Sequence, residues 1–440
     1  MTRLFPLAAL LALSACNGDD TGDTDTDADT QLDTVVERTT YDRSGWTGVY
    51  TLGLGSRVRD LVELDDGTVA VAYQYDTDHT AVTLLSTSGS FVAEDVARPE
   101  NYTQPLLLTR DGDDLLMLGA GKIDPGTNYQ QALVWRVSGS TAAIEEVATM
   151  DYWGEGGVPS SNWASFNAAA PLGDDWLLGF TAGGSFGELS QRDGGLAELS
   201  SDDTLTAPET LLSYSSDVLG AQGGLHALFP VDGGYRFAAS LNGPAFGDLV
   251  DTEISLRLGW LDADGEVISA QAVNATGALY YGDAEVVGRT TFVCGRTSVS
   301  FADEGAPTGD AAAVVLRING EGELDWVSRP LGTAESRCTE LEVGPDGMIY
   351  VGGRFDDESG ISMATLHQID AVTGEIQWSG QSTSPAVNTE ITALTASGGE
   401  LLAATRTWWS DGQTYTLGRV GTVSFAGDVS DDLWDTPILR

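Results

Sequence analysis

Residues 346–354, DGMIYVGGR, contain an Asp-Gly turn that leads directly into a strand of apolar and small residues. The same combination of a tight turn and an apolar strand occurs seven times, about every 46 to 62 residues. The strands suit burial near a crowded axis, where small residues allow close approach. The seven turns are Asp65-Asp66-Gly67, Asp111-Gly112-Asp113, Gly173-Asp174-Asp175, Asp232-Gly233-Gly234, Gly288-Arg289-Thr290, Asp346-Gly347 and Ser397-Gly398-Gly399.

Most repeats continue through a variable loop, a third strand such as AVVLRIN at 313–319, another glycine turn and a fourth strand. Four strands per repeat at this period is the signature of a β-propeller. Helical periodicity is nearly absent, so the sequence predicts an all-β chain with one β-propeller domain over residues 36–440. Seven four-stranded blades are expected. Six or eight are the alternatives, because the polar stretch QRDGGLAELSSDDTL at 191–205 is hard to pair.

The segment VERTTYDRSGWTGVYTLG, residues 36–53, contains an extra strand-like piece before the first turn. A ring of blades needs some latch that removes its free sheet edges. We therefore expect this piece to pair with the last blade and close the ring.

The charge of the chain limits its partners. It has 66 acidic and 21 basic residues, a formal net charge of -45. Such a surface repels phosphate backbones, so no nucleic acid is expected as a partner and direct docking on anionic lipid is disfavoured.

The N-terminus resembles the signal and lipobox of a bacterial lipoprotein. An apolar run from Leu4 to Ala12 follows Arg3, and Leu13-Ser14-Ala15-Cys16 comes next. The resemblance implies a signal peptide over residues 1–15, lipidation of Cys16 and anchoring to a membrane through lipid alone. The alternative is ordinary cleavage after Ala15. Asn17 in place of Asp favours the outer membrane or the cell surface of the bacterial envelope.

The next segment, residues 16–35, holds seven Asp and five Thr but no Lys, Arg or aromatic residue. It cannot bury enough apolar surface to offset the entropy of ordering, and its like charges repel. The sequence predicts a disordered acidic tether between the anchor and the propeller.

The later repeats resemble those of PQQ-like and secreted bacterial propeller proteins. The likeness to PQQ-like repeats rests on IDAVTGEIQW at 369–378, with partial echoes in GELDW at 322–326 and DGEV at 264–267. PDGMIYVGG at 345–353 resembles the repeats of secreted bacterial propeller proteins. In such repeats the Gly makes a turn and the Trp lies across the neighbouring blade. The chain departs from PQQ-dependent dehydrogenases, since it has no adjacent cysteine pair and no room for eight blades plus an insertion, so no cofactor is expected.

Cys294 and Cys338 are the cysteines that remain beside Cys16. An even pair in an exported protein favours a disulfide, and two buried free thiols are the alternative. In the repeat alignment Cys294 is late in one second strand and Cys338 is early in the next first strand. A bridge would therefore join adjacent blades.

Three arginines, Arg296, Arg354 and Arg406, occupy the same place in the second strands of three successive repeats. They are expected to crowd one sector of the loop-bearing face, beside the channel mouth. Such a sector suits a small anionic ligand, a carboxylate or an acidic glycan. The alternative is that each arginine only pairs with a nearby acid such as Asp356 or Asp411.

Aromatic residues accompany the arginines. Trp408 and Trp409 follow Arg406 and are candidates for ligand binding, although one of two adjacent strand residues normally points into the core. Other aromatic or ring-bearing residues expected in or beside the loops of that face are His79, Tyr129, Phe246, Phe301 and Tyr415.

No catalytic or metal site can be assigned from motifs. The three histidines His79, His226 and His367 have no metal-ligand spacing, and no nucleophile elbow, P-loop or dinucleotide fingerprint occurs. The sequence therefore favours a non-catalytic module that binds a ligand, a glycan or an envelope protein. The alternatives are an envelope assembly scaffold and a propeller enzyme of lyase, glycosidase or quinoprotein-like type. Carboxylates that converge at the central channel would indicate a lyase or glycosidase.

Overall fold

The computed structural model describes most of the chain from residue 49 onward. Residues 49–425, 427 and 433 are described, apart from the segments 76–78, 98–101, 123–129, 151–161, 187–188, 207–208, 213–221, 243–254, 274–278, 298–310, 332–334, 358, 383–386, 398–399 and 411–413. The predicted signal peptide, Cys16 and the tether lie outside the described residues. Within the described part, no helix is long and apolar enough to cross a membrane.

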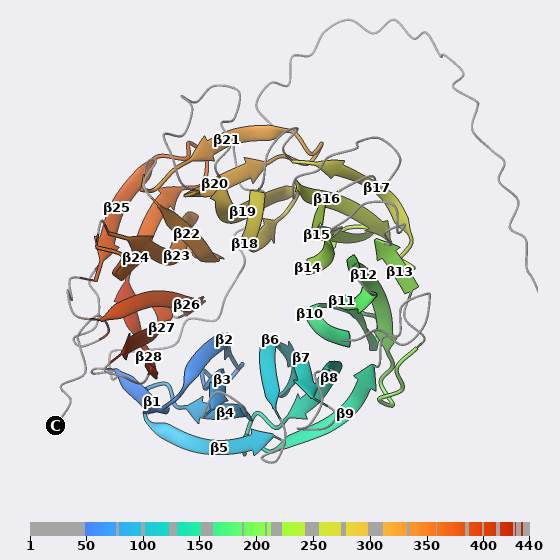
Figure 1. Cartoon of the computed structure of the whole chain (residues 1–440), viewed down its shortest axis with the longest axis horizontal. Coiled ribbons are helices and arrows are strands. Elements are labelled where there is room, and N and C mark those ends of the chain that lie inside the picture. The colour runs from blue at the N-terminus through green and yellow to red at the C-terminus, as the bar shows by residue number, and fades with distance from the viewer. Residues whose placement is uncertain are drawn as a thin grey trace, which may run out of the picture. The chain divides into compact units, whose positions relative to one another are not determined.

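The described strands form seven four-stranded antiparallel sheets, arranged as blades around a central axis (Figure 1). The innermost strands are β2 (Arg57–Glu63), β6 (Thr103–Asp111), β10 (Asn162–Leu172), β14 (Gln222–Val231), β18 (Leu279–Val287), β22 (Ser336–Val343) and β26 (Asn388–Ser397). The second strands are β3 (Val69–Tyr75), β7 (Asp114–Lys122), β11 (Asp175–Phe186), β15 (Gly234–Asn242), β19 (Thr290–Thr297), β23 (Met348–Asp356) and β27 (Glu400–Ser410).

The third strands are β4 (His79–Leu85), β8 (Gln130–Val137), β12 (Leu189–Leu199), β16 (Ser255–Asp262), β20 (Ala312–Ile318), β24 (Ser362–Asp370) and β28 (Thr414–Ser424). The outermost strands are β5 (Phe91–Ala97), β9 (Ile144–Met150), β13 (Glu209–Leu212), β17 (Val267–Ala272), β21 (Leu324–Ser328), β25 (Ile376–Gln381) and, for blade 7, β1 (Tyr50–Leu54). The prediction of a seven-bladed propeller is confirmed, and six or eight blades are excluded.

The prediction that a strand from the segment 36–53 pairs with the last blade and closes the ring is confirmed. Strand β1 pairs antiparallel with β28 and so supplies the outer edge of the last blade from the other end of the described chain. Ser56, which is fully buried, fixes the chain where it leaves β1. Its hydroxyl donates to Gly53 O over 2.6 Å and accepts from Gly418 N over 2.9 Å.

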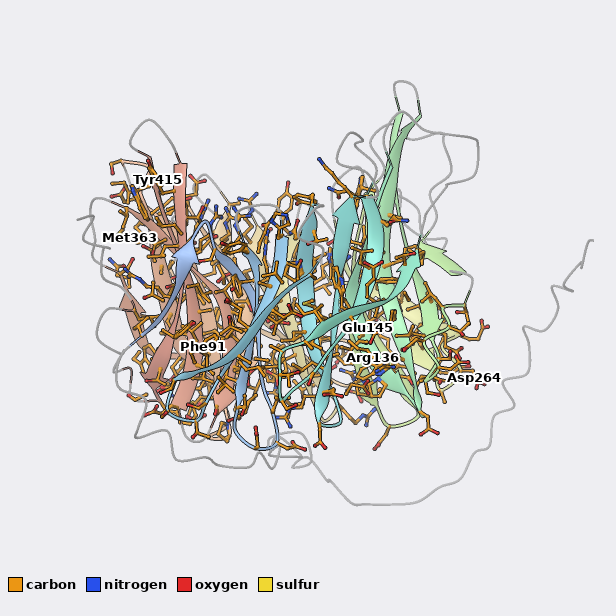
Figure 2. The ribbon with its side chains drawn as sticks, turned by 90° about the horizontal axis from the view of Figure 1, so that it is seen from below. Phe91, Arg136, Glu145, Asp264, Met363 and Tyr415 are labelled. Carbon is orange, nitrogen blue, oxygen red and sulfur yellow. A yellow bond between two sulfur atoms is a disulfide. The ribbon has the colours of Figure 1, made fainter. Side chains whose placement is uncertain are left out.

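The third blade forms despite its polar sequence. Strand β12 pairs with β11 along its whole length, and Leu196, Ala197 and Leu199 supply the buried contacts. The β11–β12 hairpin extends beyond the other blades (Figure 2). Two apolar faces per blade are covered by the neighbouring blades, which is why most buried hydrophobic side chains of the described strands belong to clusters shared between blades.

Tryptophans of the outermost strands latch adjacent blades, as the repeat pattern predicted. Trp326 of β21 lies against Gly374 of the next blade and donates its indole N–H to Ala371 O over 3.3 Å. Trp378 of β25 lies against Gly427 and donates to Phe425 O over 3.1 Å. Gly374 and Gly427 both have positive φ, and an added Cβ would meet the indole ring, so a side chain is excluded at these turns.

Every innermost strand contains one β-bulge at the same level of the ring. The extra residue re-aims the strand and its side chain at this level. Two bulge residues link adjacent blades, since Asn167 donates to Leu225 O over 3.2 Å and Thr339 donates to Ile391 O over 2.8 Å. The seven bulge residues are Arg59, Leu106, Asn167, His226, Gly282, Thr339 and Thr392.

The predicted disulfide is present between Cys294 of β19 and Cys338 of β22, with a Cα–Cα distance of 5.7 Å. It joins the fifth blade to the sixth. Gly282 makes this approach feasible, because a Cβ at residue 282 would lie 2.3 Å from Cys338 O.

Candidate functional site

The ring has two different faces. One carries the variable connections between second and third strands, and we call it the loop face; the other carries the short turns between first and second strands, and we call it the turn face. Tyr415 and Met363 lie toward the loop face and Asp264 toward the turn face in Figure 2. Each innermost strand starts at the loop face, so the residues before its bulge stand near this end of the axis.

The three aligned arginines occupy equivalent positions in the structure. Arg296, Arg354 and Arg406 each pair in register with the residue two places before the bulge of their blade. Those partners are Tyr280, Arg337 and Glu390, and in blade 1 the equivalent pair is Arg57 with Gln74. The sequence alignment of the second strands therefore identified one true level of the ring.

Three further arginines join them there. Arg59 interacts electrostatically with Arg57 and Arg406, and Arg337 interacts with Arg354 and Arg296. Sequence reasoning missed Arg57, Arg59 and Arg337, because they lie on innermost strands whose bulge register was not visible in the sequence. We call the six residues the arginine rim: Arg57, Arg59, Arg296, Arg337, Arg354 and Arg406.

The carboxylates near the rim neutralise only part of its charge. Glu390 accepts from Arg406 over 3.2 Å and lies 3.7 Å from Arg354, whose second partner is Asp356 at 3.4 Å. Arg57 and Arg337, in contrast, form no ion pair with any carboxylate that the structure describes. Asp411 lies outside the described residues. The alternative that the arginines only pair with nearby acids therefore applies in part to Arg354 and Arg406, but it does not explain Arg57 and Arg337.

Burial and the crowding of like charges lower the pKa values of rim arginines. Burial, followed by repulsion from Arg57 and Arg406, lowers the pKa of Arg59 to about 10. Burial and then Arg354 lower the pKa of Arg337. A bound anion would relieve this repulsion, because it would place negative charge among guanidinium groups that now face each other.

The two adjacent tryptophans separate as expected. Trp408 lies beneath two rim guanidinium groups, with its ring 4.8 Å from Arg406 and 5.8 Å from Arg354. Trp409 is buried and stacks on Tyr415 at 5.5 Å. Trp408 thus belongs to the rim and Trp409 to the core, whereas Tyr129, Phe246 and Phe301 lie outside the described residues.

A group of acidic residues lies next to the arginine rim along the axis, on the side toward the turn face. Asp60, Asp283 and Glu340 directly follow the bulge in blades 1, 5 and 6. Each influences the others electrostatically although the strands belong to different sectors of the ring, so the three carboxyl groups converge near the axis. This is the feature that the sequence analysis named as the mark of a lyase or glycosidase.

Two of these carboxyl groups have a clear structural role. Asp60 accepts from Leu61 N over 2.7 Å and from Leu108 N of the next blade over 2.6 Å. Asp283 accepts in the same way from Ala284 N over 2.8 Å and from Leu341 N over 2.9 Å. Burial raises the pKa of each to about 7, although these backbone hydrogen bonds oppose the shift.

Glu340 differs from both. Its carboxyl group has no hydrogen-bonding partner among the described residues, and the residue as a whole is of intermediate exposure. Burial is the largest cause that raises its pKa well above the ordinary value of 4.5, and the charges of Asp283, Asp60, Glu390 and Glu342 follow. The surroundings of Glu340 therefore favour its protonated form, which makes it the candidate proton donor among these carboxyl groups.

We predict that Glu340→Gln stabilises the fold at pH 8 and changes nothing near pH 4. The raised pKa of Glu340 means that its contribution to stability is fully present below the unfolded-state pKa and is lost as the pH rises toward the folded-state pKa. Glutamine cannot ionise, so the variant escapes this loss. Thermal unfolding midpoints between pH 4 and pH 8 measure the effect, and curves that stay parallel across this range would contradict the pKa shift.

Comparisons with known proteins agree on the fold. The sequence matches no family model and no curated protein. Among solved structures, it is similar to the GH93 alpha-L-arabinofuranosidase of Fusarium graminearum, with 10% identity, 73% of this chain and 97% of that chain covered, and a TM-score of 0.46. It is also similar to the periplasmic gluconolactonase of Pseudomonas aeruginosa, with 14% identity, coverage of 73% and 84%, and a TM-score of 0.46.

A third similar structure is the β-propeller domain of the Trilobed protease of Pyrococcus furiosus, with 10% identity, coverage of 87% and 99%, and a TM-score of 0.45. At these identities the likeness shows the propeller fold alone. It does not show the finer likeness to PQQ-like repeats.

The prediction of a non-catalytic binding module is corrected by these comparisons. The similar propellers are mostly enzymes, among them the arabinofuranosidase and the gluconolactonase, so the comparisons give no support to a non-catalytic role, and their likeness to this chain extends to the fold alone. A site in such a ring leaves no local motif, because its residues come from strands that are far apart in the chain, as Asp60 and Glu340 do.

Proposed function

We propose that the chain is a propeller hydrolase of the glycosidase type that cleaves an acidic glycan at the loop-face end of the axis. One observation carries the proposal. Glu340 and Glu390, on the neighbouring innermost strands β22 and β26, stand in opposite electrostatic surroundings. Two carboxyl groups whose environments differ in this way are the usual division of labour between a catalytic acid and its ionised partner.

The two groups would act in the following way. Glu340 holds a proton, which passes to the leaving oxygen as the glycosidic C–O bond breaks. Glu390, which forms ion pairs with Arg354 and Arg406, takes the proton of the water whose oxygen bonds to the anomeric carbon. The sum is addition of one water across one bond, with no oxidant and no cofactor.

The arginine rim supports an anionic substrate. Arg57 and Arg337 lack carboxylate partners among the described residues, and a guanidinium group binds a carboxylate through two parallel hydrogen bonds. Arg296 lies over Tyr280 at 4.9 Å, and this arrangement fixes the plane of its guanidinium group. A uronic acid residue presents such a carboxylate beside a glycosidic bond.

The proposed setting of the reaction is the bacterial cell envelope, with an envelope glycan within reach of the tether as the substrate. This setting rests on the sequence alone, through the lipobox ending at Cys16 and the acidic tether after it. The mass of the mature N-terminus measures it directly. A lipid-modified Cys16 is expected, and an unmodified terminus after Ala15 would exclude the anchor.

The function is tested by incubating the protein with paired glycans that differ in one respect, a uronic acid in one and the neutral sugar in the other. We expect new reducing ends from the uronate glycan only, with a rate that falls as salt screens the rim. A double variant, Arg296→Gln with Arg337→Gln, should raise KM by at least about 10-fold. Equal cleavage of both glycans would remove the assigned role of the rim, and cleavage of neither would remove the proposal.

A further inference from the structure

A cleft of about 610 Å³ opens on the turn face, between the fourth and fifth blades and away from the arginine rim. Its walls come from the turns β14–β15, β18–β19 and β20–β21. Its lining residues include Val231, Asp232, Arg236, Trp260, Arg289 and Gly320. A second, smaller hollow shares Arg236 and Trp260 with it and is lined by the apolar residues Phe229, Phe237, Leu258 and Ile318.

Arg236 is out of place in this fold. It pairs in register with Phe229, which lies three places after the bulge residue of β14. The residue in the same position of the second strand can be compared in the other six blades. In all of them the same position of the second strand holds an apolar or aromatic residue that is buried. These residues are Ala70, Leu116, Leu177, Phe292, Tyr350 and Leu402. The propeller therefore does not require a charge here.

The charge of Arg236 is buried and lacks a counter-ion. The residue is 6% exposed, and it forms no ion pair with any carboxylate that the structure describes. It donates to Thr291 Oγ1 over 2.6 Å and to Gly320 O over 3.4 Å, and its guanidinium group lies 5.2 Å from the ring centre of Trp260. Glu321, the nearby acid, is 3.8 Å from Arg289 instead. A buried cation without an anion is costly to keep.

We propose that this cleft binds a small organic anion, with its carboxylate on Arg236 and its apolar body against Trp260. The open side of the cleft admits a ligand, Arg289 adds a second positive charge at the rim of the cleft, and the cleft itself has room for an apolar group beside the Trp260 ring. This site is separate from the proposed hydrolytic centre, because it lies on the opposite face and shares no residue with it.

Phenylacetate is a suitable probe, and phenylacetamide is its neutral counterpart of the same shape. Titration calorimetry on the complete protein should give saturable phenylacetate binding with a Kd on the order of 1 mM or tighter. Phenylacetamide should bind at least about 10-fold more weakly, because it cannot neutralise the arginine. Arg236→Leu, which copies the residue of three sister blades, should lose at least about 10-fold in phenylacetate affinity. It should also unfold at an equal or higher temperature, since it removes a buried charge.

Two control variants assign the binding to this cleft. Arg110→Leu makes the same change of charge at an exposed arginine and should bind phenylacetate as the unmodified chain does. Arg337→Leu makes the change in the arginine rim and distinguishes phenylacetate bound at the rim from phenylacetate bound in the cleft. If Arg236→Leu does not fold, Arg236→Gln replaces it, because glutamine can still donate to Thr291. Absence of saturable binding, equal affinity for the amide, retained affinity in the Arg236 variant, or loss confined to Arg337→Leu would each overturn the proposal without bearing on the hydrolytic site.

Discussion

Replacement of Glu340 by glutamine is expected to lower kcat on a uronate glycan by about 10²- to 10⁴-fold, the usual contribution of a general acid. Glutamine keeps the size of the side chain but cannot give up a proton to the leaving oxygen. The KM should change little, because the arginine rim is untouched. The pH dependence of kcat should also lose the limb that reflects deprotonation of the acid, whose pKa is raised by burial and by the neighbouring carboxylates.

Substrates with different leaving groups distinguish two roles for Glu340, that of a general acid and that of a residue that only shapes the site. An aryl glycoside with an acidic phenol leaves without protonation, so Glu340→Gln should cleave it at a rate close to that of the unmodified chain. Glu390→Gln should be slow on both substrates, since its partner role does not depend on the leaving group. Glu321→Gln, an exposed turn-face change, is the matched control and should leave both rates unchanged. Equal losses on both substrates for Glu340→Gln would contradict the assignment.

Loss of the disulfide should have the largest effect on stability. Cys294 and Cys338 close a loop with a separation of 44 residues, and in the chain-entropy model such a link contributes about 4 kcal/mol to the free energy of unfolding. The double variant Cys294→Ala, Cys338→Ala should therefore unfold at a clearly lower denaturant concentration. The loosened contact lies between the fifth and sixth blades, where Glu340 and Asp283 also meet.

Reduction of the unmodified chain provides the control for this prediction. A reductant should shift the unfolding midpoint of the unmodified chain toward that of the double variant and leave the variant itself unchanged. The remaining difference between the two reports the space left by two buried sulfur atoms. If the reductant does not change the unfolding midpoint of the unmodified chain, the disulfide does not hold the two blades together.

Most of the fold could be predicted from the sequence because its signals are local. A turn such as Asp346-Gly347 and the strand after it are neighbours in the chain, and antiparallel pairing of consecutive strands needs no long connection. Repetition of this unit then predicts a ring. The same local logic led to the Trp latch, the disulfide and the closing strand before the first turn.

Only half of the arginine rim could be predicted from the sequence, because the placement of its other residues depends on features that are not local. Arg296, Arg354 and Arg406 could be aligned because second strands follow their turns at a fixed distance. Arg57, Arg59 and Arg337 could not, because a bulge in each innermost strand shifts the register by one residue, and a bulge has no reliable signature in a single sequence.

The sequence by itself predicted the propeller architecture, favoured seven blades over six or eight, and favoured a disulfide between Cys294 and Cys338 over two free thiols. Tertiary structure alone decided which acids meet. Asp60 and Asp283 are more than 200 positions apart in the chain. These two residues and Glu340 come close together only because the ring closes. Their raised pKa values, the unpaired rim arginines and the buried charge of Arg236 all depend on desolvation and on neighbours from other blades. These are properties of the closed ring, which no local stretch of sequence contains.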